Sequence, residues 1–239
     1  MALILMKRRN EMEEMKFRHE TKHIITYSDY LAVRSRLKLL AKSDPNVGPS
    51  GKYRIRSIYF DNYNDKALRE KIDGVNQREK FRIRYYNEDT SFIKLEKKSK
   101  NNGLSNKIAA SITKEEVNHI LDGNNEFLKE SKQALLVELY TKMQSQLLRP
   151  KVIVEYEREP FIYSIGNVRI TFDMNIKTGL YSKDFFGPNI PLLNAQENSL
   201  IVMEVKYDEF IPEIINLCIQ VNERQNSAMS KYAICRRFG

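Results

Sequence analysis

The sequence predicts an α+β fold dominated by antiparallel strands, and three observations lead to that class. Segments in which apolar and polar residues alternate with a period of two recur along most of the 239 residues. Their apolar positions are rich in β-branched and aromatic side chains, which favour strands. Stretches with helical spacing lie between some of these segments, but without the regular strand–helix–strand order of a parallel sheet. We therefore expect an antiparallel sheet with helices packed against it.

The predicted strands follow from the two-residue alternation, in which successive side chains point to opposite faces. In chain order they span residues 16–25, 53–60, 80–86, 91–98, 106–112, 152–158, 161–165, 168–173 and 201–207.

Helices are predicted where a capping residue precedes apolar residues at helical spacing. Thr113 and Glu116 match a capping box, in which each side chain accepts a hydrogen bond from the backbone of the other residue. The expected helices begin at caps Ser28, Asn62 and Thr113, span residues 126–147, and begin near Pro212.

The chain is predicted to form one domain over residues 16–239, preceded by a mobile tail of residues 1–15. No internal repeat and no Pro- or Gly-rich linker marks a further boundary. The segment MALILM is too short to span a bilayer or to serve as the apolar region of a signal peptide. Two cysteines, Cys218 and Cys235, lack metal spacing and indicate a reducing compartment. We expect a cytoplasmic protein and leave open a location at the inner face of the membrane.

Composition predicts a polyanionic partner. Forty Lys and Arg against thirty-one Asp and Glu give a net charge of +9. Nucleic acid, anionic lipid and phosphorylated substrates all fit such a charge.

Charged residues share one face on several predicted strands. In KFRIRYY, residues 80–86, Lys80, Arg82 and Arg84 alternate with apolar side chains. A solvent-exposed face of an open sheet would explain one such strand. Long cations on many strands favour closure into a barrel, with the charges inside and a polyanion between them. The pattern recurs in residues 16–25, 91–98, 168–173 and 201–207.

Common phosphate-binding and catalytic motifs are missing from the sequence. It has neither GxxxxGK[ST] nor GxGxxG, and its three histidines lack metal-ligand spacing. Any reaction is therefore expected to be phosphoryl transfer by positioning and charge neutralisation, which needs no covalent nucleophile.

An ordered set of short motifs resembles the VTC domain of polyphosphate polymerases, in the triphosphate tunnel metalloenzyme (CYTH-like) superfamily. The resemblance covers about residues 16–237. Its pieces are RHETK (18–22), IRSIYFDN (55–62), KIDGVNQREKFRIRYY (71–86), LEKKS (95–99), SNK (105–107), YEREPF (156–161), VRITFD (168–173), MEVKY (203–207) and MSKY (229–232).

This resemblance implies a closed antiparallel β-barrel with helices on the outside and a basic tunnel that binds phosphate chains and a divalent cation, Mn²⁺ or Mg²⁺. It implies catalytic roles for Lys22, Arg82, Arg84, Lys98 and Arg169. It implies phosphate binding by Arg18, Lys107, Arg158, Lys206, Ser230 and Lys231. It implies metal binding by Glu204, with Glu20 and Glu96 as further carboxylates.

Two positions depart from the simplest pattern. Arg18 replaces the first carboxylate of the ExExK motif that hydrolases and cyclases of the superfamily tend to have, which favours the polymerase branch. Strict alternation places Arg158 on the same face as Val154 and Tyr156. A bulge, or the strand end near Pro160, is therefore expected to reorient Arg158.

The expected function is ATP-dependent polyphosphate polymerisation, in which the γ-phosphate of ATP extends a polyphosphate chain. Two alternatives stay open: a triphosphate or polyphosphate hydrolase, and a non-catalytic binder of polyphosphate or nucleic acid. Nucleic acid is disfavoured because the aromatic residues mostly alternate away from the cations instead of forming a stacking platform with them. A membrane-protein partner and the oligomeric state are left open.

Overall fold

The computed structural model describes residues 18–102, 104–180, 184–195, 200–221, 225–226 and 229–237. The predicted tail, residues 1–15, lies outside the described residues. The strands are β1 (His19–Ile25), β2 (Lys42–Ser43), β3 (Tyr53–Asp61), β4 (Arg78–Tyr86), β5 (Asp89–Asn101), β6 (Leu104–Ser111), β7 (Arg149–Tyr163), β8 (Val168–Leu180), β9 (Leu193–Asn194), β10 (Ile201–Tyr207) and β11 (Gln225–Asn226). The helices are α2 (Tyr27–Leu40), α3 (Lys66–Ile72), α4 (Lys114–Leu121), α5 (Ala134–Ser145), α6 (Glu213–Cys218) and α7 (Lys231–Cys235), with short 3₁₀ turns η1 (Glu126–Glu130) and η2 (Ile165–Asn167).

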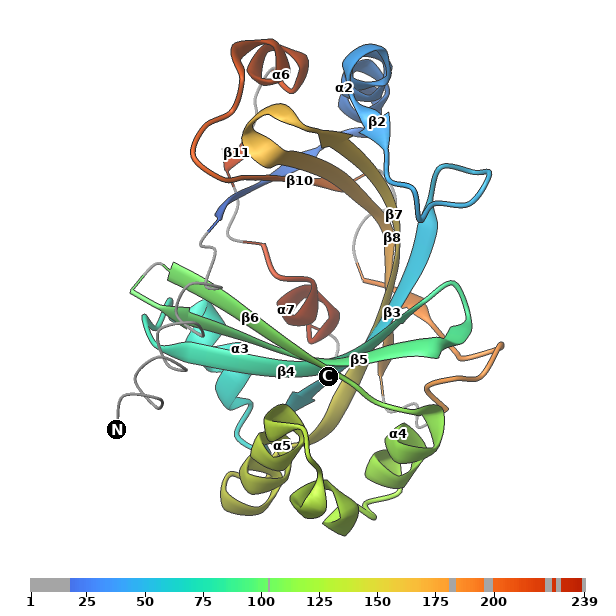
Figure 1. Ribbon diagram of the computed structural model, residues 1–239, viewed down its shortest axis with the longest axis vertical. Coiled ribbons are helices and arrows are strands. Elements are labelled where there is room, and N and C mark those ends of the chain that lie inside the picture. Colours follow the sequence, from blue (N-terminus) through green and yellow to red (C-terminus); the bar gives the residue numbers. More distant parts are fainter. Residues whose placement is uncertain are drawn as a thin grey trace.

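The strands form one antiparallel sheet, as the alternation predicted. Its order is β11-β1-β10-β8-β7-β3-β4-β5-β6, with β2 paired to β7 and β9 paired to β8. The sheet curls strongly, so that one arm, formed by β1, β10, β8 and β7, arches over a second arm, formed by β4, β5 and β6 (Figure 1). Its inner surface is called the concave face from here on.

The expectation of a closed barrel is wrong, because the sheet is open. A barrel closes only when its edge strands come within hydrogen-bonding distance. In the described part of the chain, β6 pairs only with β5, and β1 pairs only with β10 and β11. Side chains bridge the two arms instead: Lys98 Nζ on β5 lies 2.9 Å from Glu20 Oε2 on β1.

Helices cover the outer face of the sheet in two groups, and each group encloses an apolar core. Val33 and Leu37 of α2 pack with Phe172 of β8, and α6 joins the same cluster. On the other arm, Leu139 of α5 packs with Ile83 of β4, together with residues of α4. The two groups lie at opposite ends of the molecule (Figure 1). None of the described helices is long and apolar enough to cross a membrane.

One helix lies inside the curl, which corrects the expectation that all helices pack outside. Figure 1 shows α7 in the hollow between the two arms of the sheet. Tyr232 and Cys235 of α7 pack with Tyr59, Val154 and Tyr156 of the concave face. The apolar part of the concave face is therefore covered from within the curl.

Two predicted helix boundaries are wrong for local reasons. Thr26 and not Ser28 caps α2, because Asp29 stands three residues after Thr26 and completes a capping box with it. The helix predicted over 126–147 is interrupted between η1 and α5, where the Ser131 hydroxyl accepts a hydrogen bond from the Gln133 amide at 3.1 Å. Such side-chain bonds compete with helix formation.

Other boundaries follow the predictions more closely. The Thr113 capping box begins α4 as predicted. Asn62 precedes α3, although the helix itself begins at Lys66, whose amide donates to the Asn62 side chain at 3.0 Å. The segments predicted as separate strands around Pro160 form one strand, β7. Pairing with β3 has ended at Arg158, so Pro160 interrupts no bond to that neighbour.

Candidate phosphate-binding site

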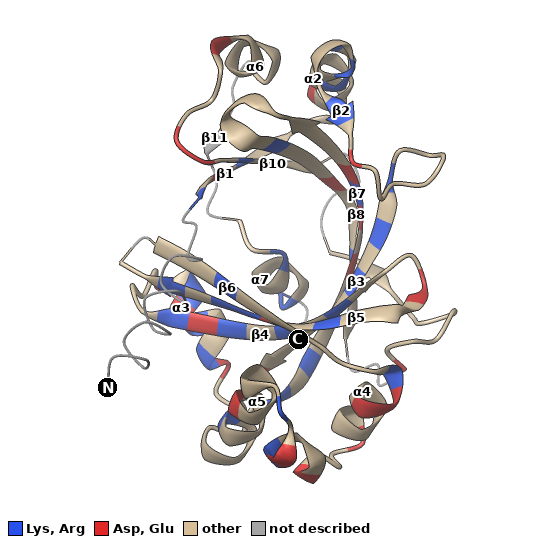
Figure 2. Ribbon diagram, in the orientation of Figure 1, with Lys and Arg blue, Asp and Glu red and all other residues tan. Residues whose placement is uncertain are grey.

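Basic side chains from both arms of the sheet gather on the concave face. Figure 2 shows Lys and Arg along β4 and β6 and on α7, which faces them. The strand register places the predicted residues Lys22, Arg82, Arg84, Lys98, Lys107, Arg158, Arg169 and Lys206 on this face, interspersed with Glu20, Glu96 and Glu204.

One group of charges lies on β4, β5 and β6. Glu96 is buried and accepts from Arg82 Nε at 2.7 Å. Lys107 Nζ lies 2.5 Å from the other oxygen of Glu96, and Arg84 Nη1 lies 3.9 Å away from the carboxylate. Glu96 therefore partly neutralises three cations and directs Arg82.

Tyrosine hydroxyls hold the arginines of this group as well. Arg82 Nη1 donates to the Tyr59 hydroxyl at 2.8 Å, and Arg84 Nη2 donates to the Tyr156 hydroxyl at 3.1 Å. Both rings are buried. These tyrosines were not among the predicted site residues. Tyr59 pairs directly with Arg82, and Tyr156 shares the face of Arg84 through the intervening strand β3.

A second group lies on β1, β10, β8 and β7. Lys22 Nζ is 2.6 Å from Glu20 Oε1, and Lys206 Nζ is 2.9 Å from Glu204 Oε1. Arg158 Nη2 lies 3.5 Å from Glu204 Oε2. The salt bridge between Glu20 and Lys98 joins this group to the opposite arm.

Arg158 reaches the concave face without the expected reorientation, which corrects that prediction. It pairs in register with Tyr53 and Asp173, and all three share the concave face. Val154 and Tyr156 share that face because α7 covers them there. The register of this ladder shifts earlier, between Glu155 and Glu157, and the extra residue lies on β8, so the shift does not reorient Arg158.

Asp173 is a central residue of the site, although it was not among the predicted site residues. Arg158 donates to both of its oxygens, at 2.6 and 2.8 Å, and Lys231 pairs with it from α7. Asp173 is fully buried. The two-residue alternation in VRITFD already placed Asp173 on the same face as Arg169.

The remaining predicted residues have partners of other kinds. Arg169 donates to Asp44 at 2.7 Å and to the Tyr53 hydroxyl at 3.1 Å. Arg18 lies at the end of β1, where its Nε is 2.8 Å from Asp208 Oδ1, away from the central groups. The Ser230 hydroxyl caps α7 by accepting from the Ala233 amide at 3.5 Å.

The carboxylates of the site stay ionised at neutral pH. Burial raises the pKa of Glu204, but Lys206 and Lys22 outweigh it and hold this pKa well below its usual range. Burial likewise opposes ionisation of Glu96, yet Arg82 and its neighbouring cations lower the Glu96 pKa. For Glu20, burial and Glu204 raise the pKa, but the surrounding lysines lower it to about 2.

Lys80 and Tyr59 are the groups of the site that titrate near neutrality. Burial lowers the pKa of Lys80 to about 7, and Lys22 and Arg82 add to this effect against the opposing influence of Tyr59. Burial opposes ionisation of Tyr59, but Arg82 and Lys80 lower its pKa to about 7. The Lys80 ammonium lies 5.6 Å from the centre of the Tyr59 ring.

The structure offers two carboxylates rather than a full set of metal ligands. Among the described residues, no group of three or more His, Cys, Asp and Glu side chains could hold a metal ion. Glu20 and Glu204 are close enough to influence each other, whereas Glu96 is enclosed by cations of the opposite arm. Two carboxylates fit Mg²⁺ or Mn²⁺, which bind hard oxygen ligands and complete their shells with phosphate oxygens and water.

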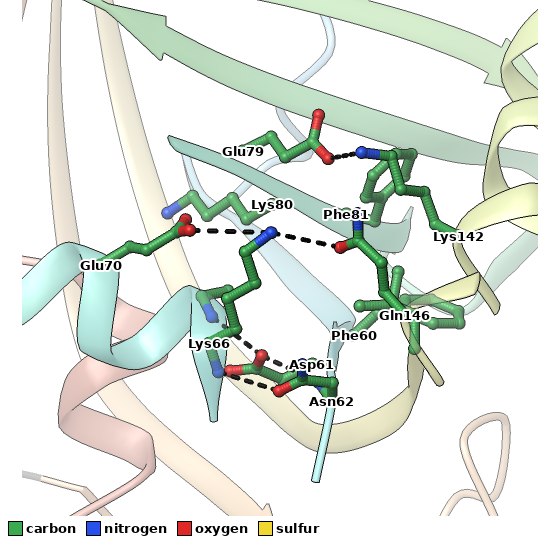
Figure 3. A pocket seen from close by; sticks show the side chains of 12 residues that line it. Phe60, Asp61, Asn62, Lys66, Glu70, Glu79, Lys80, Phe81, Lys142 and Gln146 are labelled. Atoms are coloured by element: carbon green, nitrogen blue, oxygen red, sulfur yellow. Dashed lines mark hydrogen bonds and ion pairs between the residues drawn. The ribbon is translucent and has the colours of Figure 1, made fainter. Parts of the chain in front are cut away.

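None of the predicted site residues lines either of two further hollows, although Lys80 borders the first. A cavity of about 20 Å³ between α3, β4 and α5 has room for about one water molecule (Figure 3). Lys66, Glu70 and Gln146 are linked across it by contacts of 3.8 and 3.3 Å. A wider hollow of about 830 Å³ lies between α2 and the start of β3, and none of the predicted site residues lines it.

The chain thus folds into a curled antiparallel sheet with a basic concave face. The sequence profile of the VTC domain matches residues 17–238. The chain therefore belongs to the VTC domain family, within the CYTH-like tunnel superfamily. No curated protein sequence matches it significantly.

Solved structures with related shapes come from bacteria and archaea. A candidate adenylate cyclase from Bacillus halodurans is similar with a TM-score of 0.47 and 13% identity, over 83% of each chain. The PH1012 protein from Pyrococcus horikoshii OT3 is similar with a TM-score of 0.46 and 10% identity, over 91% of this chain and 98% of that chain.

Proposed function

We propose that the protein is an ATP-dependent polyphosphate polymerase, which transfers the γ-phosphate of ATP to the end of a polyphosphate chain. The observation that carries this proposal is the continuity of the basic side chains across both arms of the concave face. Lys98 and Lys107 stand on one arm, and Lys22 and Arg169 on the other. A row of cations suits an extended anion with a charge on every unit, since Arg grips phosphate oxygens in pairs and Lys adds point charge.

Family membership supports the phosphate chemistry, and the aromatic residues support a phosphate chain over nucleic acid. Proteins that bind single strands stack bases on accessible rings. Here Tyr59 and Tyr156 of the concave face are buried, and their hydroxyls accept from Arg82 and Arg84. These rings position guanidinium groups and offer no stacking surface.

In the proposed reaction, the terminal phosphate oxygen of the acceptor chain attacks the γ-phosphorus of ATP in line. A bond forms between that oxygen and the γ-phosphorus, and the bond from the γ-phosphorus to the β–γ bridging oxygen breaks, releasing ADP. The attacking phosphate is largely ionised at neutral pH, so no general base is required. Arg82, Arg84 and Arg158 would neutralise the charge on the transferred group.

Glu204 and Glu20 would hold the divalent cation, which supplies positive charge between phosphate oxygens when it is bound. Lys22 pairs with Glu20, and Lys206 pairs with Glu204. The same lysines can turn to a phosphate chain, because a Lys side chain is flexible and carries three donors.

The test is incubation of the purified protein with ATP and Mn²⁺, followed by electrophoretic detection of polyphosphate. We expect chain growth in the wild type and a loss of at least about 100-fold in rate for Arg84→Ala and Glu204→Gln. Lys38→Ala, at an exposed position of α2, serves as the matched control and should retain full activity. Release of orthophosphate without chain growth would instead identify a hydrolase, and tight binding without turnover would identify a binding protein.

A further inference from the structure

Thr171 on β8 carries a buried hydroxyl without a hydrogen-bond partner in the part of the chain that the structure describes. Thr171 as a whole is 4% exposed to solvent. Two residues earlier on the same strand face, Nε of Arg169 is also buried without a partner among the described residues. The Thr171 hydroxyl and the Arg169 Nε are therefore two neighbouring donors on the concave face, and neither has a hydrogen-bond partner among the described residues.

Nearby protein acceptors are already engaged. Glu204 stands directly opposite Thr171 on β10, and its two oxygens pair with Lys206 and Arg158 but do not accept from the Thr171 hydroxyl. Asp173, the next residue on this face of β8, is occupied by Arg158 and Lys231.

The other neighbouring strand offers nothing in compensation. Thr171 faces Pro160 of β7, whose side chain has no polar atom. The hydroxyl thus lies among charged groups that are bound to one another.

An unpaired buried hydroxyl costs free energy, typically about 1–3 kcal/mol, so a partner from outside the chain is favoured. That partner must be an acceptor, because the Arg169 Nε can only donate. It must also suit the cations Arg158 and Lys22 nearby. A phosphoryl group has several anionic oxygens and satisfies each requirement.

We propose that the Thr171 hydroxyl binds substrate directly, donating a hydrogen bond to a non-bridging phosphoryl oxygen that Arg169 Nε also helps to hold. This inference rests on the proposed function, because it takes the ligand to be a phosphate chain. It adds an uncharged hydrogen-bond donor to a site whose other predicted ligands are mostly charged. The hydroxyl provides direction that a lysine point charge lacks.

The experiment measures tripolyphosphate binding by titration calorimetry, with Thr171→Val and Thr171→Ser as a matched pair. Valine keeps the branched shape without the hydroxyl, and serine keeps the hydroxyl without the methyl group. We expect Thr171→Val to weaken binding about 10- to 100-fold, as for loss of a hydrogen bond to a charged acceptor. Thr171→Ser should stay within about threefold of the wild type, since it retains the donor.

Thermal unfolding without ligand supplies a second readout. Removal of an unsatisfied hydroxyl should leave the unfolding temperature of Thr171→Val unchanged or raise it, while binding weakens. A threonine with a purely structural role would give the reverse: a lower unfolding temperature and unchanged tripolyphosphate affinity. That outcome would overturn the proposal.

The outcomes also separate this inference from the proposed function. Wild-type protein that binds tripolyphosphate and loses affinity on Thr171→Val, yet makes no polymer from ATP, would refute polymerase activity and leave the subsite standing. Polymer synthesis with equal tripolyphosphate affinity in wild type and Thr171→Val would refute the subsite alone. Wild-type protein without measurable affinity for tripolyphosphate would refute both.

Discussion

Glu96 illustrates how one carboxylate can organise several cations. It was predicted as a metal ligand, a role that stays a prediction, and it stands between Arg82 and Lys107. A charge that is buried with its partners on nearby strands fixes their directions, even where the pair adds little net stability. We infer that Glu96 holds Arg82 ready for a phosphate group and that Glu204 and Glu20 are the better metal candidates.

Lys80 gives a prediction at the scale of the single residue. Its pKa and that of Tyr59 are both lowered to about 7. Below pH 7 Lys80 is charged and Tyr59 is neutral, and above it each group loses a proton, so the site loses positive charge. The wild type should therefore lose affinity for tripolyphosphate relative to Lys80→Met as pH rises from 7 to 9, a comparison in which ionisation of the probe itself cancels.

Calorimetric titration across this pH range checks the prediction. Lys80→Met should bind more weakly at pH 7 and show a shallower decline, because one of the two titrating groups is gone. Lys38→Met on the outer surface should follow the wild-type curve. An identical pH dependence of affinity in the wild type and Lys80→Met would contradict the assignment.

At the scale of elements, α7 determines how much of the concave face remains polar. Tyr232 stacks on Tyr59 with ring centres 5.2 Å apart, and its hydroxyl donates to the buried Asp61. Asp61 also accepts from the amides of Ala67 and Leu68 at the start of α3. These contacts fix a helix of only five residues inside the curl, where its own hydrogen bonds could not hold it.

Removal of the Tyr232 hydroxyl should release part of this anchor. We expect Tyr232→Phe to lower the free energy of unfolding by about 1–3 kcal/mol, because Asp61 loses a buried donor. Urea denaturation measures the change. Tyr63→Phe, at a residue that is 74% exposed, is the control and should leave the free energy of unfolding unchanged. Equal stability of both variants with the wild type would show that the helix is held by apolar contacts alone.

At the scale of the whole molecule, an open sheet stays curled although its concave face carries a surplus of like charge. Carboxylates on both arms offset that surplus, and the pair between Glu20 and Lys98 spans the gap that backbone pairing of the described strands does not close. The curled fold therefore depends on ionised carboxylates.

Acid should weaken the fold for this reason. The Glu20 pKa is lowered from 4.5 to about 2, and the pKa values of Glu204, Glu96 and Asp173 are also lowered. Between pH 4.5 and 2 the unfolded chain binds more protons than the folded one. The contribution of these carboxylates to the free energy of unfolding is therefore complete above about pH 4.5 and is lost as pH falls toward 2. We expect a loss of about 2 kcal/mol or more, measured by urea denaturation at successive pH values.

Variants locate the source of this acid sensitivity. Glu20→Gln should flatten the profile, since the group that titrates is removed. Glu130→Gln, at an exposed position beyond the concave face, should reproduce the wild-type profile. A wild-type stability that does not change between pH 5 and 2 would contradict the account.

Local sequence patterns were enough to predict the antiparallel class, the cationic strand faces and the family. Alternation in a strand is a local property, so Arg82 and Arg84 could be assigned to one face from KFRIRYY alone. The ordered motifs likewise needed no coordinates to indicate the VTC domain, which the profile match then confirmed.

Other features could not be predicted from local patterns, because they depend on contacts between residues distant in the chain. The sheet is open or closed depending on whether β6 comes close enough to β1 to pair with it. The sequence of either strand alone does not determine that distance. The place of α7 inside the curl explains why Arg158 shares a face with Tyr156, a conflict that alternation could not resolve. The unsatisfied hydroxyl of Thr171 appears only once the partners of Glu204 and Asp173 are known, since a hydrogen bond is a property of three-dimensional distance.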